Sequence, residues 1–147
     1  MTAPAAVPTT TEQHHDPHEI RHHPEFDGTV RVRPGEEATA VRNIPNTLAV
    51  FATHFPRKPV LPGVLLLESM GALAATVCEG PASTGWRLTG VRGVRFRHFV
   101  GPGDQVEIHV RVTGRHERSV DLSASARVGD RTVATARTLT MTLGEAT

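Results

Sequence analysis

The chain has 147 residues, with 16 basic and 15 acidic side chains and a formal net charge of +1. This length fits one domain that can bury a core without disulfides or metal ions, and the balanced charge excludes the strongly basic surface that nucleic-acid binding needs. The single cysteine, Cys78, excludes an intramolecular disulfide.

The first residues show no periodic pattern and no basic segment followed by an apolar core, so we expect no secretory signal there. Residues 1–13 are rich in Ala, Pro and Thr. The next ten residues contain five histidines: His14, His15, His18, His22 and His23. His18 and His22 are four apart and could present metal ligands on one helix face, but no cysteine or ordered scaffold accompanies them. We therefore predict an irregular tail over residues 1–18, no metal site, and a single domain over residues 19–147.

Two short strands are predicted after the tail. In residues 29–33 valine alternates with arginine, which is the period-two pattern of a half-buried strand. A Pro-Gly pair then marks a turn, and residues 37–44 form a second, weaker strand.

The middle of the chain predicts one buried helix, from Pro62 to about residue 79. Residues 64–75 carry too many apolar side chains for a single stripe, and a helix that is apolar nearly all round is a buried helix. Pro62 suits the first turn, and a Gly-Pro pair at residues 80–81 ends the helix. Because this region contains Glu68 it is a poor membrane span, so we expect a cytoplasmic protein without a membrane partner.

The second half of the chain predicts four strands, over residues 90–96, 105–112, 120–128 and 131–143. The last three alternate apolar and polar side chains, and a Gly-Asp pair at residues 129–130 predicts a two-residue hairpin turn. An antiparallel sheet with one solvated face buries the other face. The helix is the one long apolar element available, so we predict an α+β fold in which a curved antiparallel sheet wraps around it.

A charge inside an apolar helix suggests a chemical role for Glu68. A buried carboxyl group is either paired or kept protonated, and a protonated one can act as a general acid. His54 lies upstream in a proline-rich loop and can act as a base near neutral pH. The helix start at Gly63 presents backbone N–H groups to a developing oxyanion. Together they suit proton abstraction next to a carbonyl with loss of a β-hydroxyl, although Glu68 could instead pair with a sheet arginine and His54 could be an ordinary loop residue.

Two motifs resemble one enzyme family. The stretch THFPRKPVLPGVLLLESMGA is similar to G-H-F-P-G-x-P-x-M-P-G-V-L-x-x-E-A-M-A-Q, and GVRGVRFRHFVGPGDQVEIHV is similar to ARFRRPVVPGDQL. Both patterns are typical of 3-hydroxyacyl-acyl carrier protein dehydratases of the FabZ and FabA type, and the likeness covers residues 42–143. It implies a hot-dog fold and the dehydration of carrier-bound 3-hydroxyacyl thioesters to trans-2-enoyl thioesters.

The resemblance also implies a role for each matching residue. His54 matches the histidine that removes the C2 proton, and Glu68 matches the carboxyl group that protonates the leaving 3-hydroxyl. Gly63, beside Val64 at the helix start, matches the glycine whose N–H binds the thioester oxygen. Val60 matches the position whose carbonyl orients the histidine. In the family the two catalytic side chains of one site come from different subunits.

The resemblance implies an acyl carrier protein as partner and no cofactor, since the substrate is carried on the carrier's phosphopantetheine. Basic residues beside the tunnel mouth would dock the carrier, and they are predicted as Arg95, Arg97, Arg57, Lys58 and Arg92. The catalytic unit would be a homodimer, a trimer of dimers, or a heterodimer with a second hot-dog chain.

Several positions depart from the family pattern. Thr53 and Arg57 replace glycines, and Ser69, Gly71 and Ala72 follow Glu68 where the family has Ala, Ala and Gln. These departures favour a specialised enzyme of polyketide or polyene synthesis over the housekeeping enzyme of fatty-acid synthesis. Two alternatives stay open: an auxiliary subunit that completes another chain's site, and a hot-dog thioesterase.

Overall fold

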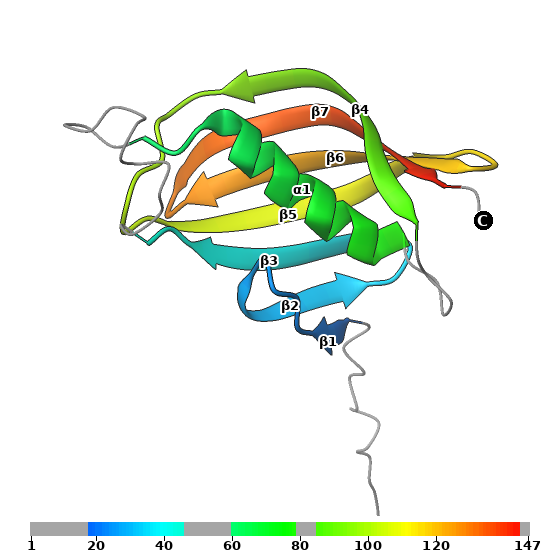
Figure 1. Ribbon diagram of the computed structural model, residues 1–147, viewed down its shortest axis with the longest axis horizontal. Helices are drawn as coiled ribbons and strands as arrows, with labels where there is room; N and C mark the ends of the chain where they lie inside the picture. Colours follow the sequence, from blue (N-terminus) through cyan, green and yellow to red (C-terminus); the bar gives the residue numbers. More distant parts are fainter. Residues whose placement is uncertain (1–17, 46–59, 79–84, 145–147) are drawn as a thin grey trace, which may run out of the picture.

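Seven strands form one antiparallel sheet that curves around a single helix within residues 18–45, 60–78 and 85–144, which the computed structural model describes (Figure 1). The strands are β1 (Glu19–Arg21), β2 (Asp27–Arg33), β3 (Glu37–Asn43), β4 (Trp86–Phe96), β5 (Gln105–Arg115), β6 (Ser119–Val128) and β7 (Arg131–Leu143), and the helix is α1 (Gly63–Cys78). The order across the sheet is β1-β2-β3-β5-β6-β7-β4. The predicted arrangement of a sheet wrapped around one helix is confirmed, with β1 and β4 at the two edges.

Alternating side chains build the centre of the sheet as the sequence predicts. On β5, Val106, Ile108 and Val110 are fully buried, whereas Glu107 between them is exposed. Successive side chains of a strand point to opposite faces, so one face of the sheet is apolar and packs against α1. The turn between β6 and β7 holds Gly129 at a φ of 60°, the left-handed conformation that a two-residue hairpin turn requires.

Two edge elements differ from the prediction. The three-residue strand β1, which pairs with β2, is absent from the predicted elements. β4 begins at Trp86 instead of residue 90, and its register with β7 shifts between Leu88 and Gly90. This β-bulge interrupts the alternation of inward and outward side chains, so the first part of the strand does not continue the pattern of the rest.

The helix packs its inner face on the sheet and is tied at its C-terminal end. Its deeply buried apolar side chains are Leu66, Met70, Leu73, Ala74 and Val77. The N–H of Gly35 donates to the carbonyl of Val77 at 3.0 Å, and Arg21 Nη1 donates to the carbonyl of Thr76 at 3.2 Å. A cation from β1 therefore compensates the C-terminal end of the helix dipole, although the helix's own last turn carries no basic residue.

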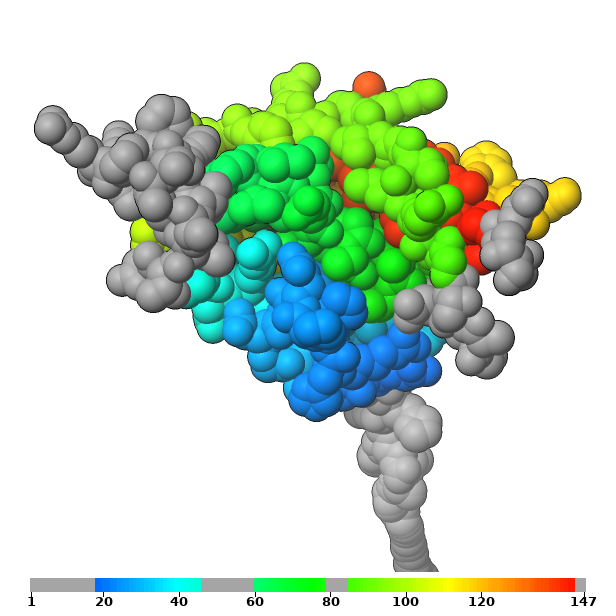
Figure 2. All heavy atoms as spheres, viewed as in Figure 1, coloured from blue at the N-terminus to red at the C-terminus, as the bar shows by residue number. Residues whose placement is uncertain are grey.

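The prediction that the helix is buried on all sides is wrong for the single chain. Val64 is 58% exposed and Glu68 is also exposed. Figure 2 shows atoms of α1 at the surface, flanked by β4 on one side and by the N-terminal strands on the other. The sheet covers one face of the helix, and no other described element covers the opposite face. An apolar outer face explains why the sequence pattern indicates all-round burial.

The outer face of the sheet carries an ion pair that makes stability depend on pH. His109 Nε2 lies 2.9 Å from Glu37 Oε1. The hydrogen bond from His109 lowers the pKa of Glu37 below its ordinary 4.5, partial burial opposes this shift, and the charges of His109, Arg111 and His18 reinforce it.

We expect Glu37→Gln to flatten the pH dependence of the free energy of unfolding below pH 4.5. A carboxyl group whose pKa is lower in the folded state stabilises the fold above its unfolded pKa, and this stabilisation is lost as the pH falls through the folded pKa. Urea unfolding of both proteins at several acidic pH values measures the slope. His109→Asn removes the main cause and should flatten the slope as well; an unchanged slope in either variant contradicts the assignment.

Candidate functional site

The first turns of α1 bring several predicted site residues together. Gly63 is the first residue of the helix, Val64 follows it, and Glu68 lies one turn beyond Val64 on the same exposed side. Val60 and Leu61 lead into the helix, and the N–H of Leu61 donates to the carbonyl of Val100 at 2.7 Å. The helix start is therefore fastened to the segment that follows β4. His54, Arg57 and Lys58 lie outside the described residues.

An apolar groove runs along this helix start. We name it the helix-start groove; its volume is about 340 Å³, and its lining includes Val60, Leu61, Gly63, Val64, Phe96 and Phe99. Phe96 and Phe99 are 52% and 73% exposed. The N–H groups of a helix's first turn have no partner within the helix. The groove thus combines apolar walls with backbone donors, which suits an acyl thioester.

Gly63 leaves room for an aromatic ring over the helix start. A Cβ atom at this position would lie 2.6 Å from Phe96 Cζ, far inside contact distance. The absence of a side chain at Gly63 therefore lets Phe96, the last residue of β4, pack across the first residue of α1. The glycine of the PGVL motif therefore has a steric role at the helix start.

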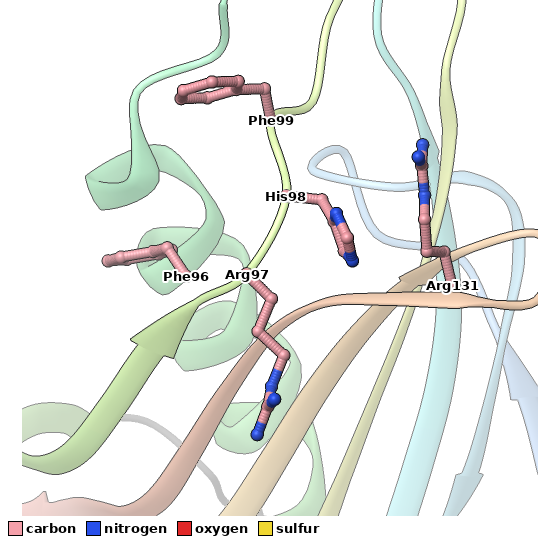
Figure 3. A pocket seen from close by; sticks show the side chains of 5 residues that line it. All are labelled: Phe96, Arg97, His98, Phe99 and Arg131. Carbon is pink, nitrogen blue, oxygen red and sulfur yellow. The ribbon is translucent and has the colours of Figure 1, made fainter.

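A second, basic pocket adjoins the groove. Its volume is about 450 Å³, and its polar lining consists of Arg97, His98 and Arg131. Figure 3 shows Phe96 and Phe99 pointing toward α1 and His98 pointing the opposite way. The N–H of Arg97 donates to the carbonyl of Val133 at 2.8 Å, which holds the end of β4 beside the beginning of β7. We call these three residues the basic pocket.

The predicted docking arginines are not all in one place. Arg97 belongs to the basic pocket, whereas Arg92 lies near Asp121 of β6. The pKa of Asp121 is lowered mainly by its hydrogen bond from Thr140, and the charge of Arg92 adds to this effect. Arg95 is exposed near the end of β4. Sequence reasoning missed Arg131. Arg131 lies close to Arg97 because β4 pairs with β7. The predicted hairpin turn just before Arg131 was the one sequence signal that β7 begins there.

Glu68 does not have the environment that the sequence predicts. Its side chain is exposed, and among the described residues it has no hydrogen bond or ion pair. The expected burial is therefore wrong for the single chain, because Glu68 lies on the helix face that the sheet does not cover. The expected alternative, pairing with a sheet arginine, is not seen for Glu68 either.

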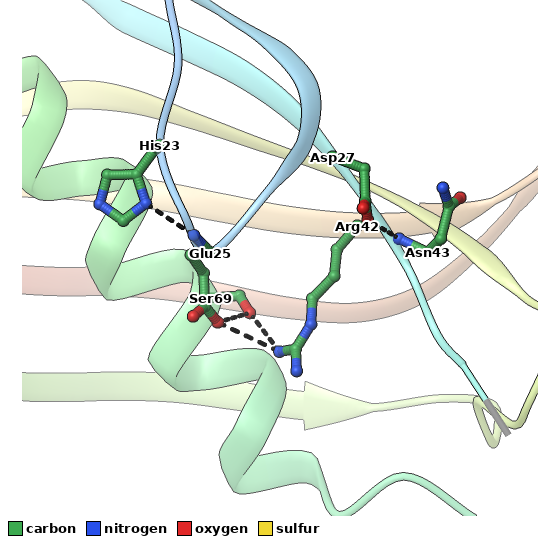
Figure 4. A network of polar contacts seen from close by, with 6 residues as sticks. All are labelled: His23, Glu25, Asp27, Arg42, Asn43 and Ser69. Atoms are coloured by element: carbon green, nitrogen blue, oxygen red, sulfur yellow. Dashed lines mark hydrogen bonds and ion pairs between the residues drawn. The ribbon is translucent and has the colours of Figure 1, made fainter. Parts of the chain in front are cut away.

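The neighbouring residue, Ser69, makes the contact with a sheet arginine. Ser69 is fully buried, and its Oγ lies 2.8 Å from Arg42 Nη1 of β3 and 2.8 Å from Glu25 Oε1 (Figure 4). Arg42 and Glu25 also form an ion pair at 3.1 Å. Sequence reasoning missed this network because its three members come from segments that only the fold brings together.

Among the described residues, no group of three or more His, Cys, Asp and Glu side chains is placed to hold a metal ion. Within the same ranges, no helix is long and apolar enough to cross a membrane.

Comparisons with known proteins show the family. The model of the ApeI-like family, described as ApeI dehydratase, matches residues 31–136. The 3-hydroxyacyl-acyl carrier protein dehydratase FabZ of Gluconacetobacter diazotrophicus is 36% identical over 125 residues, which cover 81% of this chain and 77% of that protein. The FabZ of Anaeromyxobacter sp. strain K is 34% identical over 131 residues, covering 83% of this chain and 84% of its own.

Solved structures show the same fold. The dehydratase heterocomplex ApeI:P from Xenorhabdus doucetiae matches with a TM-score of 0.60 at 21% identity, covering 74% of this chain and 88% of the matched one. A hot-dog-like protein from Thermanaerovibrio acidaminovorans matches with a TM-score of 0.62 at 22% identity, covering 77% and 84%. These matches confirm the hot-dog fold, and the sequence relatives confirm the predicted enzyme class. The chain therefore belongs to the ApeI-like family of hot-dog dehydratases, which is related to the FabZ-type 3-hydroxyacyl-acyl carrier protein dehydratases.

Proposed function

We propose that the chain removes water from a 3-hydroxyacyl thioester carried on the phosphopantetheine of an acyl carrier protein. The observation that carries this proposal is the apolar helix-start groove, which is lined by Gly63 and Val64, with the exposed Glu68 one helical turn beyond Val64. The acyl chain would lie along the apolar walls, with its thioester oxygen at the first turn of α1. The product would be a trans-2-enoyl thioester, on a polyketide, polyene or fatty-acid chain.

Three groups would share the chemistry. His54 takes the C2 proton, and the electron pair moves toward the thioester oxygen, where the Gly63 N–H and the positive end of the helix dipole stabilise it. The C2–C3 double bond forms as the C3–O bond breaks, and Glu68 gives its proton to the departing hydroxyl, which leaves as water. Return of the C2 proton from His54 to Glu68 through solvent restores both groups.

A second hot-dog chain would complete the site. Val64, Phe96 and Phe99 leave an exposed apolar surface around the groove, and β4 forms an open edge beside it. A chain packed there would bury the apolar side chains and exclude water from around Glu68, which favours the neutral acid. The partner is a copy of this chain, in a dimer or a trimer of dimers, or a different hot-dog chain; the structural match ApeI:P, a dehydratase heterocomplex, supports the second possibility.

The carrier would dock at the basic pocket. Arg97 and Arg131 supply guanidinium groups that suit a phosphate or carboxylates, and the pocket adjoins the groove that would receive the acyl chain. Arg95, Arg92, Arg57 and Lys58 stay predictions for carrier docking. A carrier-bound substrate also fits the predicted cytoplasmic location.

Mass spectrometry of the carrier tests the reaction directly. Incubation with a 3-hydroxyacyl carrier protein should remove one water from the acyl chain, and incubation with the 2-enoyl carrier protein should add one. Release of free acid would support the thioesterase instead. Turnover that needs a second hot-dog chain would support the auxiliary subunit, and no change with carrier or coenzyme A substrates in either direction contradicts the proposal.

Charge reversal tests the docking surface. We expect Arg97→Glu and Arg131→Glu each to raise KM for the carrier substrate about 5- to 10-fold with little change in kcat, because surface charges mainly affect encounter and orientation. A pantetheine thioester without the carrier or its phosphate is the matched substrate, and its KM should not change. Arg118→Glu, in the β5–β6 turn, is the control variant. An equal KM increase for both substrates would mean that the arginines do not dock the carrier.

A further inference from the structure

Ser69 differs from the other buried polar side chain of the described residues. The two are Ser69, which is fully buried, and Thr76, which is 5% exposed. Thr76 Oγ1 donates to the carbonyl of Leu73 at 2.6 Å, so its hydrogen bond stays within the helix. Ser69 instead reaches Arg42 of β3 and Glu25 of the segment between β1 and β2 (Figure 4). Ser69 is therefore the polar connection between the middle of α1 and two other segments.

The Ser69 hydroxyl both accepts and donates a hydrogen bond in this network. It accepts a hydrogen bond from Arg42 Nη1 and donates one to Glu25 Oε1, each at 2.8 Å. The side chains of Arg42 and Glu25 are only 17% and 32% exposed. Hydrogen bonds to charged groups are stronger than those between neutral groups, and they have a preferred direction. The hydrophobic effect that holds the apolar face of α1 is non-directional, so the network adds a directional constraint to the packing of the helix.

The connection lies next to Glu68, because Ser69 is the following residue of α1. Consecutive helix residues are 1.5 Å apart along the axis and about 100° apart around it. A fixed Ser69 therefore fixes the height and direction of the Cα–Cβ bond of Glu68. The helix start is held through Leu61 and its end through Val77 and Thr76, and Ser69 holds the part between them.

We infer that Ser69, bridged to Arg42 and Glu25, is a positioning residue that sets the orientation of Glu68. The inference rests on the proposed acid role of Glu68. Ser69 touches no substrate; it restricts the rotation of α1 so that the Glu68 carboxyl group meets the leaving hydroxyl. Misplacement of a catalytic group by about 1 Å can cost about 10²-fold in rate, so partial loss of this restriction should have a clear kinetic effect.

The first experiment compares Ser69→Ala with Thr76→Val. Each change removes one buried hydroxyl from the same helix, and Ser69→Ala leaves the Arg42–Glu25 ion pair in place. We expect each to lower the melting temperature by about 3 °C. Only Ser69→Ala should lower kcat, by about tenfold, with KM for the carrier substrate unchanged. If kcat falls equally in both variants, or stays at the wild-type value in both, Ser69 has no positioning role.

The second experiment asks whether Ser69 acts through Glu68. In a Glu68→Gln background, Ser69→Ala should cause no further loss of the residual rate, because a positioning residue has no effect once its target group is gone. Independent, multiplicative losses would overturn the inference. If Glu68→Gln alone keeps full activity, the acid role itself fails, and this outcome is distinct from the first.

A third variant covers the case in which Ser69→Ala does not fold. Glu25→Gln changes a partly exposed side chain and keeps an oxygen acceptor, but it removes the charge that strengthens the hydrogen bonds of Glu25 with Ser69 and Arg42. It should lower kcat about threefold without affecting KM. An unchanged kcat in folded Glu25→Gln would count against the role of the network.

Discussion

Glu68→Gln is expected to lower the rate of dehydration by roughly 10²- to 10⁴-fold, the usual contribution of a general acid. The amide has nearly the shape of the carboxyl group but has no acidic proton for the leaving hydroxyl. The side chain is exposed in the single chain, so the free energy of unfolding should barely change. Rates in both directions, from 3-hydroxyacyl and from 2-enoyl carrier protein, should fall by the same factor because both pass through one transition state.

Glu36→Gln is the matched control, since it makes the same chemical change at an exposed glutamate on the turn between β2 and β3. It should keep the wild-type rate. His54→Ala should lose activity to a similar extent as Glu68→Gln if the two groups act as the base and acid of one elimination. Full activity of Glu68→Gln would remove the acid assignment and leave the reaction class untouched.

Gly63→Ala is expected to lower kcat/KM about 10- to 100-fold with a small effect on stability. The new methyl group would lie 2.6 Å from the Phe96 ring, so the ring must swing away and alter the helix-start groove. Phe96 is half exposed, and its displacement should cost little folding free energy. The substrate thioester would then have less room at the helix start, and small misplacements of reacting groups lower the reaction rate strongly.

Gly71→Ala is the matched control in the same helix. Its Cβ would lie 3.3 Å from Leu88 Cδ2, a tight contact that a flexible side chain can relieve, and it should change kcat/KM much less. The double variant Gly63→Ala/Phe96→Ala separates two causes of the loss. Recovery of activity would assign the loss to the displaced ring, and persistence would assign it to the methyl group beside the oxyanion. Wild-type kcat/KM in Gly63→Ala contradicts both.

Elements with strict periodicity were predictable from the sequence. β5, β6 and β7 alternate apolar and polar side chains because one face packs against α1, and the hairpin turn at Gly129 needs a residue that accepts a positive φ. β1 has only three residues, too few to show a period. The bulge in β4 moves its first residues out of phase, so the strand was predicted to start too late.

The site was predictable only where a motif occupies consecutive positions. The PGVL step placed Gly63 at the helix start, and the order of residues along α1 placed Glu68 further along it. Arg131 and the Ser69 network depend on pairing between distant segments, which a single sequence does not reveal. The burial of Glu68 was wrongly predicted because the helix is apolar also on the face that the sheet does not cover, so the sequence pattern does not show which face is buried.

The edge position of β4 affects the tendency of the chain to aggregate. An open edge strand of this length can pair with exposed strands of other chains, which leads to aggregation. Three exposed arginines, Arg87, Arg92 and Arg95, are spaced along this edge, and the bulge bends it. Like charges and an irregular edge discourage indiscriminate β-pairing. The same residues therefore serve as gatekeepers that keep this edge from aggregating.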